Sequence, residues 1–305
     1  MNIPQIIFSL PPGLRRHKLV RFLLWLSPES RYQEVRFNGY GRIFVDLSDP
    51  CPRQYFLRQS FEPHFFAVAR PFLEKGGVFF DVGANVGFCT FGLAGLLPEA
   101  DIEFHLFEAN EDLVQLQYRS MDLHPGRKIF PNHACVTHHG GFSKLKLVRE
   151  DLGSSHIAET GTHKVPNLLL DDYIRDRHIK RVDFLKLDVE GCERAALEGA
   201  AASLCRGDIP VVYTEMIETN LNRYGVRPVD LLEMLDSAGF DAFYCMRQDV
   251  PGDAMSQPSF FLDHPAGRLE LKRADPRRVP AGVHTNVLAV HRISPWTGKI
   301  KTSDS

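Results

Sequence analysis

The sequence lacks several features that would assign it to a class of protein directly. Its charge is nearly balanced, with 36 Lys and Arg against 38 Asp and Glu, so nothing indicates nucleic-acid binding or an acidic tail. Its six cysteines include no C-x-x-C pair, and no Cys or His cluster has the spacing of a metal site. We therefore interpret the cysteines as free thiols and expect a cytoplasmic protein without a bound metal.

A long hydrophobic run is also absent, so no transmembrane helix is predicted. The apolar segment at residues 19–26 is far shorter than the ~20 residues of a membrane span, and Arg21 interrupts it. Ser27-Pro28-Glu29 follows where a signal peptide would have a small-residue cleavage site. Because basic and apolar residues alternate here, two interpretations remain. Residues 15–26 form either a helix docked on the main domain or an interfacial helix that makes peripheral membrane contact.

The composition that is present, 44% hydrophobic and 24% charged residues, is that of an ordinary folded protein. Residues 1–75 are predicted to form an N-terminal extension packed on the main domain. It would contain a helix, a hairpin at 35–47 with its turn at 38–41, and a second helix over 52–73. Residues 76–295 would form the main domain and 296–305 a C-terminal tail.

Strand-like and helix-like segments alternate through the main domain. Strands are predicted at 78–82, 102–107, 128–136, 182–189, 210–216, 240–246 and 287–292, with supplementary strands at 142–148 and 165–170. Helices are predicted at 88–97, 111–121 and 229–238. This alternation predicts an α/β fold with a doubly wound, mostly parallel, seven-stranded sheet. The carboxyl ends of the strands would meet along one edge, where ligands bind.

A glycine-rich turn joins the first strand of the main domain to its helix. It reads Asp81-Val82-Gly83-Ala84-Asn85-Val86-Gly87. Glycines allow a ligand to approach the backbone, and the first N–H groups of a helix favour negative charge. Asn85 stands where the dinucleotide fingerprint G-x-G-x-x-G has its middle glycine, which disfavours an NAD-dependent oxidoreductase.

Glu108 ends the second strand, 21 residues after Gly87. A carboxylate at this position can accept hydrogen bonds from both hydroxyls of a ribose, and it would repel a 2′-phosphate. Asp81, in the glycine turn, would suit the cationic end of a ligand. The alternative is a tight turn with a surface glutamate, which any α/β protein can carry.

Charged residues also gather at the ends of two later strands. Lys186 and Asp188 are two positions apart, so they share one strand face about 6 to 7 Å from each other. A lysine in a buried strand requires a paired charge. Glu190 follows at the bend, and Glu215 ends the next strand, facing the same cleft. Glu193 lies in the first turn of a helix, and we interpret it as a stabilising acid there.

Taken together, the motifs resemble those of FkbM-type methyltransferases over roughly residues 50–245. Residues 81–87 resemble the D-V-G-A-N-x-G motif, 107–110 the F-E-P-N segment with Ala109 in place of proline, and 186–193 the K-I-D-V-E-G-x-E segment. The resemblance implies a class I, Rossmann-like methyltransferase that uses S-adenosylmethionine. It also implies a set of cofactor-binding residues, in chain order Asp81, Gly83, Ala84, Asn85, Gly87, Glu108, Ala109, Asn110, Asn132 and Ala134.

The same resemblance implies O-methylation of a sugar, a polyketide or another secondary metabolite. A hydroxyl acceptor must lose its proton, which requires a positioned base. We assign this role to Asp188 or Glu215, with Lys186 holding the acids in place. Alternatively, these acids and Glu190 only bind substrate hydroxyls. His156 is either a further base or a solvated loop histidine.

Acceptor specificity is expected from residues 1–75 and from 248–284, because both fall outside the cofactor motifs. The second segment is long for a connection and is predicted to be a lid, a binding loop or a solvated loop. Its basic residues, which would meet an acidic substrate or a phosphorylated carrier, are Arg268, Lys272, Arg273, Arg277 and Arg278. Two rival functions remain: a catalytically inactive S-adenosylmethionine-binding scaffold, and the disfavoured NAD-dependent oxidoreductase.

Overall fold

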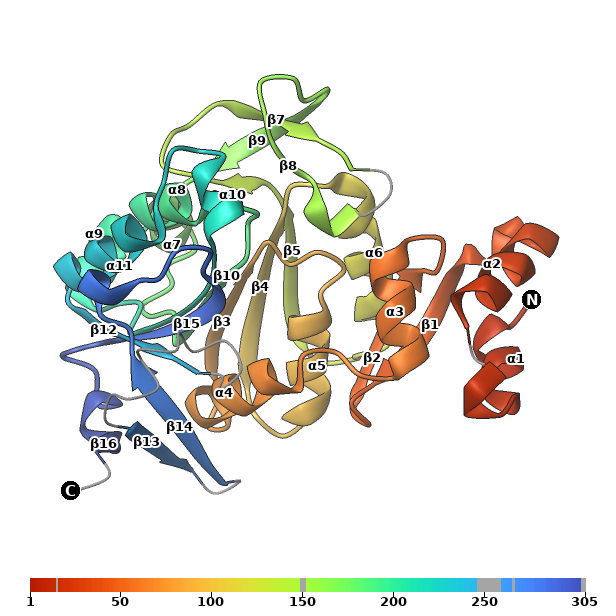
Figure 1. The fold of residues 1–305 in the computed structure, drawn as a ribbon, viewed down its shortest axis with the longest axis horizontal. Helices are drawn as coiled ribbons and strands as arrows, with labels where there is room; N and C mark the ends of the chain where they lie inside the picture. The colour runs from red at the N-terminus through yellow and green to blue at the C-terminus, as the bar shows by residue number, and fades with distance from the viewer. Residues whose placement is uncertain (15, 149–151, 246–258, 265–266, 303–305) are drawn as a thin grey trace.

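A ten-stranded β-sheet with helices on both faces forms the body of the protein (Figure 1). The computed structural model describes residues 1–14, 16–148, 152–245, 259–264 and 267–302. In spatial order the strands are β16 (Ile300–Thr302), β13 (Ser259–His264), β14 (Gly267–Arg273), β12 (Phe240–Tyr244), β15 (His284–His291), β11 (Val211–Ile217), β10 (Phe184–Leu187), β3 (Gly77–Val82), β4 (Ile102–Glu108) and β5 (Lys128–His133).

The centre of this sheet is parallel. The strands β11, β10, β3, β4 and β5 are neighbours that run in the same direction, so their carboxyl ends lie along one edge. Strand β15 is antiparallel to both of its neighbours, β11 and β12. The predicted α/β fold is confirmed, but the predicted number of seven strands is too low. The reason is that β13, β14 and β16 extend the sheet beyond β12.

Helices cover both faces because the parallel strands are apolar on both sides. Phe79 and Phe80 of β3 are both fully buried, and each belongs to a different hydrophobic cluster. The cluster of Phe79 includes α4 (Pro63–Leu73), α5 (Phe88–Leu96) and α6 (Glu111–Met121). The cluster of Phe80 includes α7 (Leu170–Asp176), α8 (Glu193–Glu198), α9 (Ala201–Arg206), α10 (Glu218–Asn222) and α11 (Pro228–Ser237).

Part of the segment predicted to be a long loop is instead a hairpin of the sheet. In β14, apolar residues alternate with polar ones, and Leu262 of β13 and Leu271 of β14 are fully buried. That period of two is typical of a strand with one buried face, and the loop interpretation overlooked it. Three of the basic residues are paired with acids: Arg268 with Asp263, Arg273 with Asp241 and Arg277 with Asp275. Residues 246–258 and 265–266 lie outside the described residues.

The N-terminal extension contains two helices, a hairpin and a third helix before α4. They are α1 (Ile3–Ser9), α2 (His17–Leu26), β1 (Tyr32–Phe37), β2 (Gly41–Asp46) and α3 (Pro50–Arg58). The predicted hairpin is confirmed, but the single helix over 52–73 is wrong. The helical conformation is interrupted between α3 and α4, where Gln59 and Glu62 both have positive φ. Glu62 also precedes Pro63, and a residue before proline avoids the helical region. The backbone N–H of Phe44 donates to Ser120 Oγ of α6 at 2.9 Å, which joins the hairpin to the main domain.

A second, small sheet lies beside the carboxyl edge of the main sheet, at the top of Figure 1. Its strands are β6 (Cys135–Val136), β9 (His163–Leu168), β7 (Phe142–Lys146) and β8 (His156–Ile157). Tyr224 donates a hydrogen bond to the carbonyl of Ile157 at 2.8 Å, which ties this sheet to the chain after α10. All six cysteines lie within the described residues and are free thiols. Among the described helices, none has the length and apolar character of a membrane span.

Candidate active site

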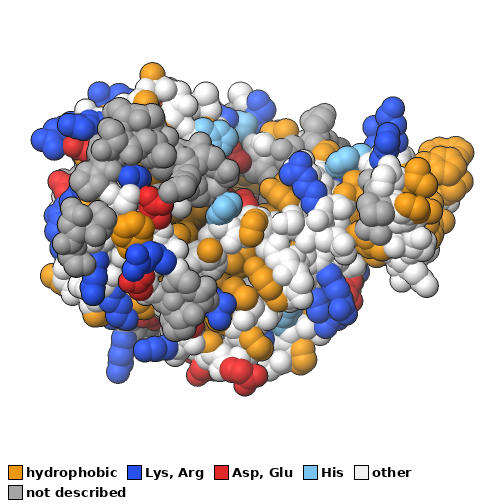
Figure 2. Space-filling view, turned by 60° about the horizontal axis from the view of Figure 1, so that its bottom comes forward, with side chains coloured by type: hydrophobic (Ala, Val, Ile, Leu, Met, Phe, Trp, Pro, Cys, Tyr) orange, Lys and Arg blue, Asp and Glu red, His pale blue; other side chains and the backbone are white. Residues whose placement is uncertain are grey.

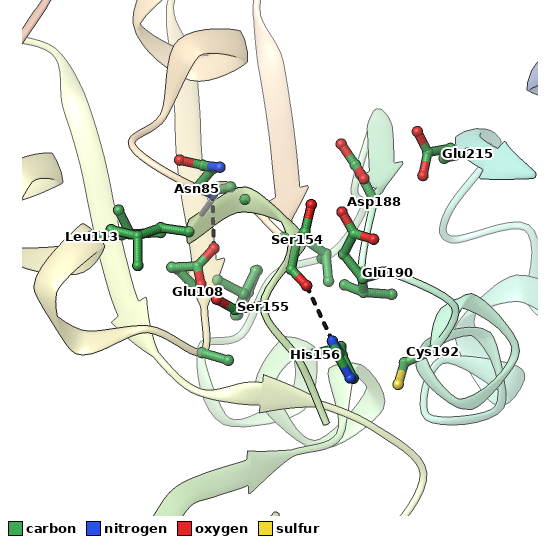
Figure 3. Close-up of a pocket in the computed structure, with 18 of the residues that line it drawn as sticks. Asn85, Glu108, Leu113, Ser154, Ser155, His156, Asp188, Glu190, Cys192 and Glu215 are labelled. Carbon is green, nitrogen blue, oxygen red and sulfur yellow. Dashed lines mark hydrogen bonds between the residues drawn. The ribbon is translucent and has the colours of Figure 1, made fainter. Parts of the chain in front are cut away.

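A cavity of about 260 Å³ opens at the carboxyl edge of β3, β4, β10 and β11. The residues predicted for the site that line this cavity are Gly83, Ala84, Asn85, Glu108, Ala109, Ala134, Lys186, Asp188, Glu190 and Glu215. Figure 3 shows Asn85 and Glu108 on one side and Asp188, Glu190 and Glu215 on the other. The fold therefore brings the two predicted groups of residues into one cavity.

The other four residues predicted to bind the cofactor lie behind the cavity wall. Asp81 is fully buried and accepts a hydrogen bond from Thr90 Oγ1 at 2.8 Å. Gly87 begins α5 with a φ of +94°, and the side chain of Asn110 caps the start of α6. The amide of Asn132 donates to two backbone carbonyls of the sheet. These contacts support the framework of the cavity.

The glycine turn is shaped by contacts that few residue types allow. Gly83 has a φ of +74°, and a Cβ here would lie 1.7 Å from the backbone oxygen of Asp188. Asn85 also has a positive φ, +52°, and its side-chain oxygen accepts a hydrogen bond from Val86 N. Gln117 of α6, which sequence analysis did not single out, donates to the carbonyl of Asn85 at 2.6 Å. The turn is thereby held between the end of β10 and helix α6.

Glu108 accepts a backbone hydrogen bond on each carboxylate oxygen. The donors are the N–H groups of Asn110 and Asn85, each at 2.8 Å. They fix the plane of the carboxylate at the cavity wall and leave each oxygen able to accept a further hydrogen bond. Burial raises the pKa of Glu108, while the two N–H groups oppose that shift. The arrangement is suited to a ligand with paired hydroxyls.

Lys186 lies between two carboxylates. Its Nζ is 3.3 Å from Oδ1 of Asp81 and 3.3 Å from Oδ2 of Asp188. Burial alone would lower the pKa of Lys186, but Asp188 and Asp81 raise it well above its ordinary value. Lys186 therefore stays positively charged and holds the side chain of Asp188 in position, directly after the carboxyl end of β10.

The two remaining predicted acids have different surroundings. Burial raises the pKa of Glu215, and the carboxylates of Asp188 and Glu190 raise it further. Glu215 therefore favours the protonated form, in which it donates a hydrogen bond. Glu190 has a φ of +55°, and its Oε2 accepts a hydrogen bond from Asn220 at 2.9 Å. Of the two predicted bases, Asp188 is the one that Lys186 contacts.

Two further predicted residues take up clear positions. Glu193 accepts hydrogen bonds from the backbone N–H groups of Val189 and Gly191, so it stabilises the bend before α8 as expected. His156 lines the cavity on β8, where its Nδ1 lies 3.1 Å from the carbonyl of Ser154. Within the described part of the chain, no group of three or more His, Cys, Asp or Glu is arranged to hold a metal ion.

Glu62 is a cavity residue that sequence analysis missed. It lies between α3 and α4 with a φ of +27°, which is uncommon for a residue other than glycine. Tyr55 and Phe61 line the same wall of the cavity. Their ring centroids lie 5.3 and 4.6 Å, respectively, from that of Phe88 in α5. Pro63 is the sequence signal that could have placed Glu62 outside a helix, because a proline inside the predicted helix over 52–73 indicates that the helix ends before it.

We expect the stability of the Glu62→Gln variant to differ from wild type only at higher pH. Burial raises the pKa of Glu62 to about 7, and the Asp188 carboxylate acts in the same direction. The folded state therefore binds this proton more tightly than the unfolded state, and wild-type stability falls as pH rises between the two pKa values. The variant does not lose stability in this way, because glutamine does not ionise. After allowance for solvent in the cavity, it should be about 1 kcal/mol more stable at pH 8.

The measurement is urea unfolding of both proteins from acidic pH to pH 8. The curves should coincide below the ordinary pKa of a glutamate and separate as pH rises to about 7. A constant offset at every pH would contradict an ionisation of Glu62 as the cause.

The fold and the cavity define a class of protein. The class is a Rossmann-like α/β protein with a ligand site at the carboxyl edge of its sheet, between a glycine turn and a carboxylate. A family model described as "Methyltransferase FkbM domain" matches residues 81–242, more than half of the chain. The protein belongs to the FkbM methyltransferase family.

Several solved structures are similar to this chain at low sequence identity. The methyltransferase FkbM from Methylobacillus flagellatus KT is 18% identical with a TM-score of 0.39, and the match covers 66% of this chain and 44% of that one. TYW2 from M. jannaschii, in complex with AdoMet, is 9% identical with a TM-score of 0.37 and coverages of 86% and 87%. TrmK from M. capricolum, in complex with S-adenosyl-homocysteine, is 10% identical with a TM-score of 0.36 and coverages of 72% and 70%. No curated protein matches the chain.

Proposed function

We propose that the protein transfers a methyl group from S-adenosylmethionine to a hydroxyl oxygen of a sugar, a polyketide or another small secondary metabolite. The observation that carries this proposal is that Glu108 and the Lys186–Asp188 ion pair line one cavity. Glu108 is suited to the ribose of the cofactor, and Asp188 to a hydroxyl of the acceptor. Membership of the FkbM family supports methyl transfer as the reaction.

The chemistry of the cavity residues fits this cofactor. Glu108 can accept hydrogen bonds from both ribose hydroxyls, and Gly83 and Ala84 offer a wall of small residues to the methionine end. Even with Glu215 protonated, the other acidic side chains that line the cavity outnumber Lys186 and favour a positively charged ligand; they are Glu62, Glu108, Asp188 and Glu190. When bound, S-adenosylmethionine would supply an electrophilic methyl group attached to a sulfonium.

The roles of the residues near the acceptor follow from their contacts. Asp188 would accept the proton that the acceptor hydroxyl loses on methylation. The donor's carbon–sulfur bond would break in the same step, so that S-adenosylhomocysteine would leave as a neutral thioether. Lys186 holds Asp188 in place through the 3.3 Å ion pair. Glu215, in its protonated form, donates a hydrogen bond to a neighbouring oxygen of the acceptor. Much of the acceleration then comes from alignment of the two reactants in the cavity.

Glu108→Ala should weaken the binding of S-adenosylmethionine by about 10- to 100-fold, the loss of hydrogen bonds to a charged group. Equilibrium dialysis with labelled cofactor measures this directly. The matched control is Glu111→Ala, which removes an exposed glutamate from the first turn of α6, three residues along the chain. Equal affinity of the two variants would contradict the ribose role of Glu108.

The reaction itself is tested by incubating the protein with methyl-labelled S-adenosylmethionine and a panel of sugars and polyketides. Mass spectrometry should locate the label in an ether that survives mild base. Label that base releases would instead be a carboxyl ester. Tight cofactor binding without transfer to any extracted metabolite would favour the inactive scaffold and contradict the proposed reaction.

A further inference from the structure

Helix α2 presents an apolar face that the rest of the described chain leaves exposed. Val20 and Leu23 are buried against the extension, so the helix is docked on the protein through one side. On the other side Phe22, Trp25 and Leu26 are 53%, 73% and 52% exposed. Phe22 and Trp25 stack on one another with ring centroids 6.0 Å apart. The helix is therefore docked, but on the N-terminal extension rather than on the main domain. Contact of its exposed side with a membrane stays a prediction.

The position of this face in the molecule makes it accessible. Figure 1 places α1 and α2 at one end of the molecule, away from the main sheet. Figure 2 shows hydrophobic side chains gathered at that end, with Lys and Arg side chains beside them. Leu14, just before the helix, is also 57% exposed. Apolar surface concentrated at one extremity is typical of an interaction site.

The charged side chains on helix α2 and directly before it have one sign. The chain has no Asp or Glu before Glu29, although its formal net charge is −2. Arg16, Lys18 and Arg21 lie on or next to α2 and are exposed. An aromatic and aliphatic face bordered by Lys and Arg is the pattern of a helix that lies in the interface of an anionic lipid bilayer. A second copy of the chain fits less well, because a symmetric contact pairs this face with itself and α2 offers no acidic side chain to the basic residues of the other copy.

We infer that Phe22, Trp25 and Leu26 dock on a membrane surface that contains anionic lipid, with Arg16, Lys18 and Arg21 contacting the phosphate groups. Helix α2 would lie parallel to the surface, because Val20 and Leu23 keep its opposite side on the protein. The three apolar side chains then enter the boundary between head groups and acyl chains. This inference is independent of the reaction in the cavity.

The experiment is co-sedimentation of the full chain with vesicles of phosphatidylcholine, with and without phosphatidylglycerol. Binding should require phosphatidylglycerol and should weaken as salt is added, because the charges are exposed. Lys18→Ala combined with Arg21→Ala should lower the partition coefficient by roughly 25-fold, about fivefold for each charge. Phe22→Ser combined with Trp25→Ser should lower it at least as much. Ile293→Ser, at a position that is also 73% exposed, should have no effect.

Trp25 supplies a second readout that a folding defect would not imitate. The chain has two tryptophans, and Trp296→Phe leaves Trp25 as the single emitter. Its emission should move to shorter wavelength when anionic vesicles are added. Absence of that shift, or unchanged binding of the Phe22/Trp25 variant with an unaltered circular dichroism melting curve, would overturn the inference. A shift that depends on protein concentration without vesicles would also overturn it, in favour of a second copy.

Discussion

Asp188→Asn is expected to lower kcat by about 10²- to 10⁴-fold while leaving cofactor binding nearly unchanged. The reason is that Asn cannot accept the proton of an acceptor hydroxyl, although it has the same shape. Lys186 would lose one of the two carboxylates that lie 3.3 Å from its Nζ but would keep Asp81. The measurement is methyl transfer to whichever hydroxyl acceptor the panel reveals, together with dialysis of labelled cofactor.

The comparison variant is Glu215→Gln. Because burial and the neighbouring carboxylates raise the pKa of Glu215, wild-type Glu215 and its glutamine replacement both carry no charge at neutral pH. Its loss of kcat should therefore be much smaller than that of Asp188→Asn. A full loss in Glu215→Gln with activity retained in Asp188→Asn would reverse the two roles. Full activity in both variants would place the base elsewhere, with His156 as the next candidate in the cavity.

The second large effect is expected from Gly83→Ala, which should reduce the free energy of unfolding by about 2 to 5 kcal/mol. A Cβ at this position would lie 1.7 Å from the backbone oxygen of Asp188, and the φ of +74° is itself unfavourable for alanine. The end of β10 would have to move away from the glycine turn. That movement would separate Asp188 from the cofactor side of the cavity, so methyl transfer should be lost as well.

Gly126→Ala is the matched control for this prediction. Gly126 has a similar φ of +80°, but a Cβ there would have nothing within 4 Å. Gly126→Ala should therefore reduce the free energy of unfolding by about 1 to 2 kcal/mol, which is the cost of a positive φ for alanine. Its cofactor binding should be normal. Urea unfolding of the two variants separates the steric contribution from the backbone contribution. Equal destabilisation would mean that the turn and β10 can separate without cost.

Local sequence signals account for the elements that were predicted well. The predicted helix over residues 111–121 is confirmed as α6, and local features mark its start: Asn110 caps it and acids occupy its first turn. The glycine turn and Glu108 follow buried strands directly, so their place at the carboxyl edge could be read from chain order. Lys186 within an apolar strand predicted a charged partner, and Asp188 lies within 3.3 Å of it.

Other features depend on contacts between distant parts of the chain. Glu62 lies in the cavity wall next to Phe61, whose ring stacks on Phe88, a contact that no local pattern specifies. Gln117 supports the glycine turn from another helix, and its sequence context is that of an ordinary helical glutamine. The pairing of β13 with β14 was hidden by the length of the surrounding segment, even though Leu269 and Leu271 of β14 follow a strand period.

The most direct test of the account is a calorimetric titration of the wild-type protein with S-adenosylhomocysteine, with NADH titrated in parallel. The account predicts saturable binding of S-adenosylhomocysteine, because Glu108 and the glycine turn form one wall of the cavity. It predicts no binding of NADH, because the turn carries Asn85 where the dinucleotide fingerprint has a glycine. Binding of NADH, or no heat with S-adenosylhomocysteine, would contradict the central claim that this cavity holds the methyl donor.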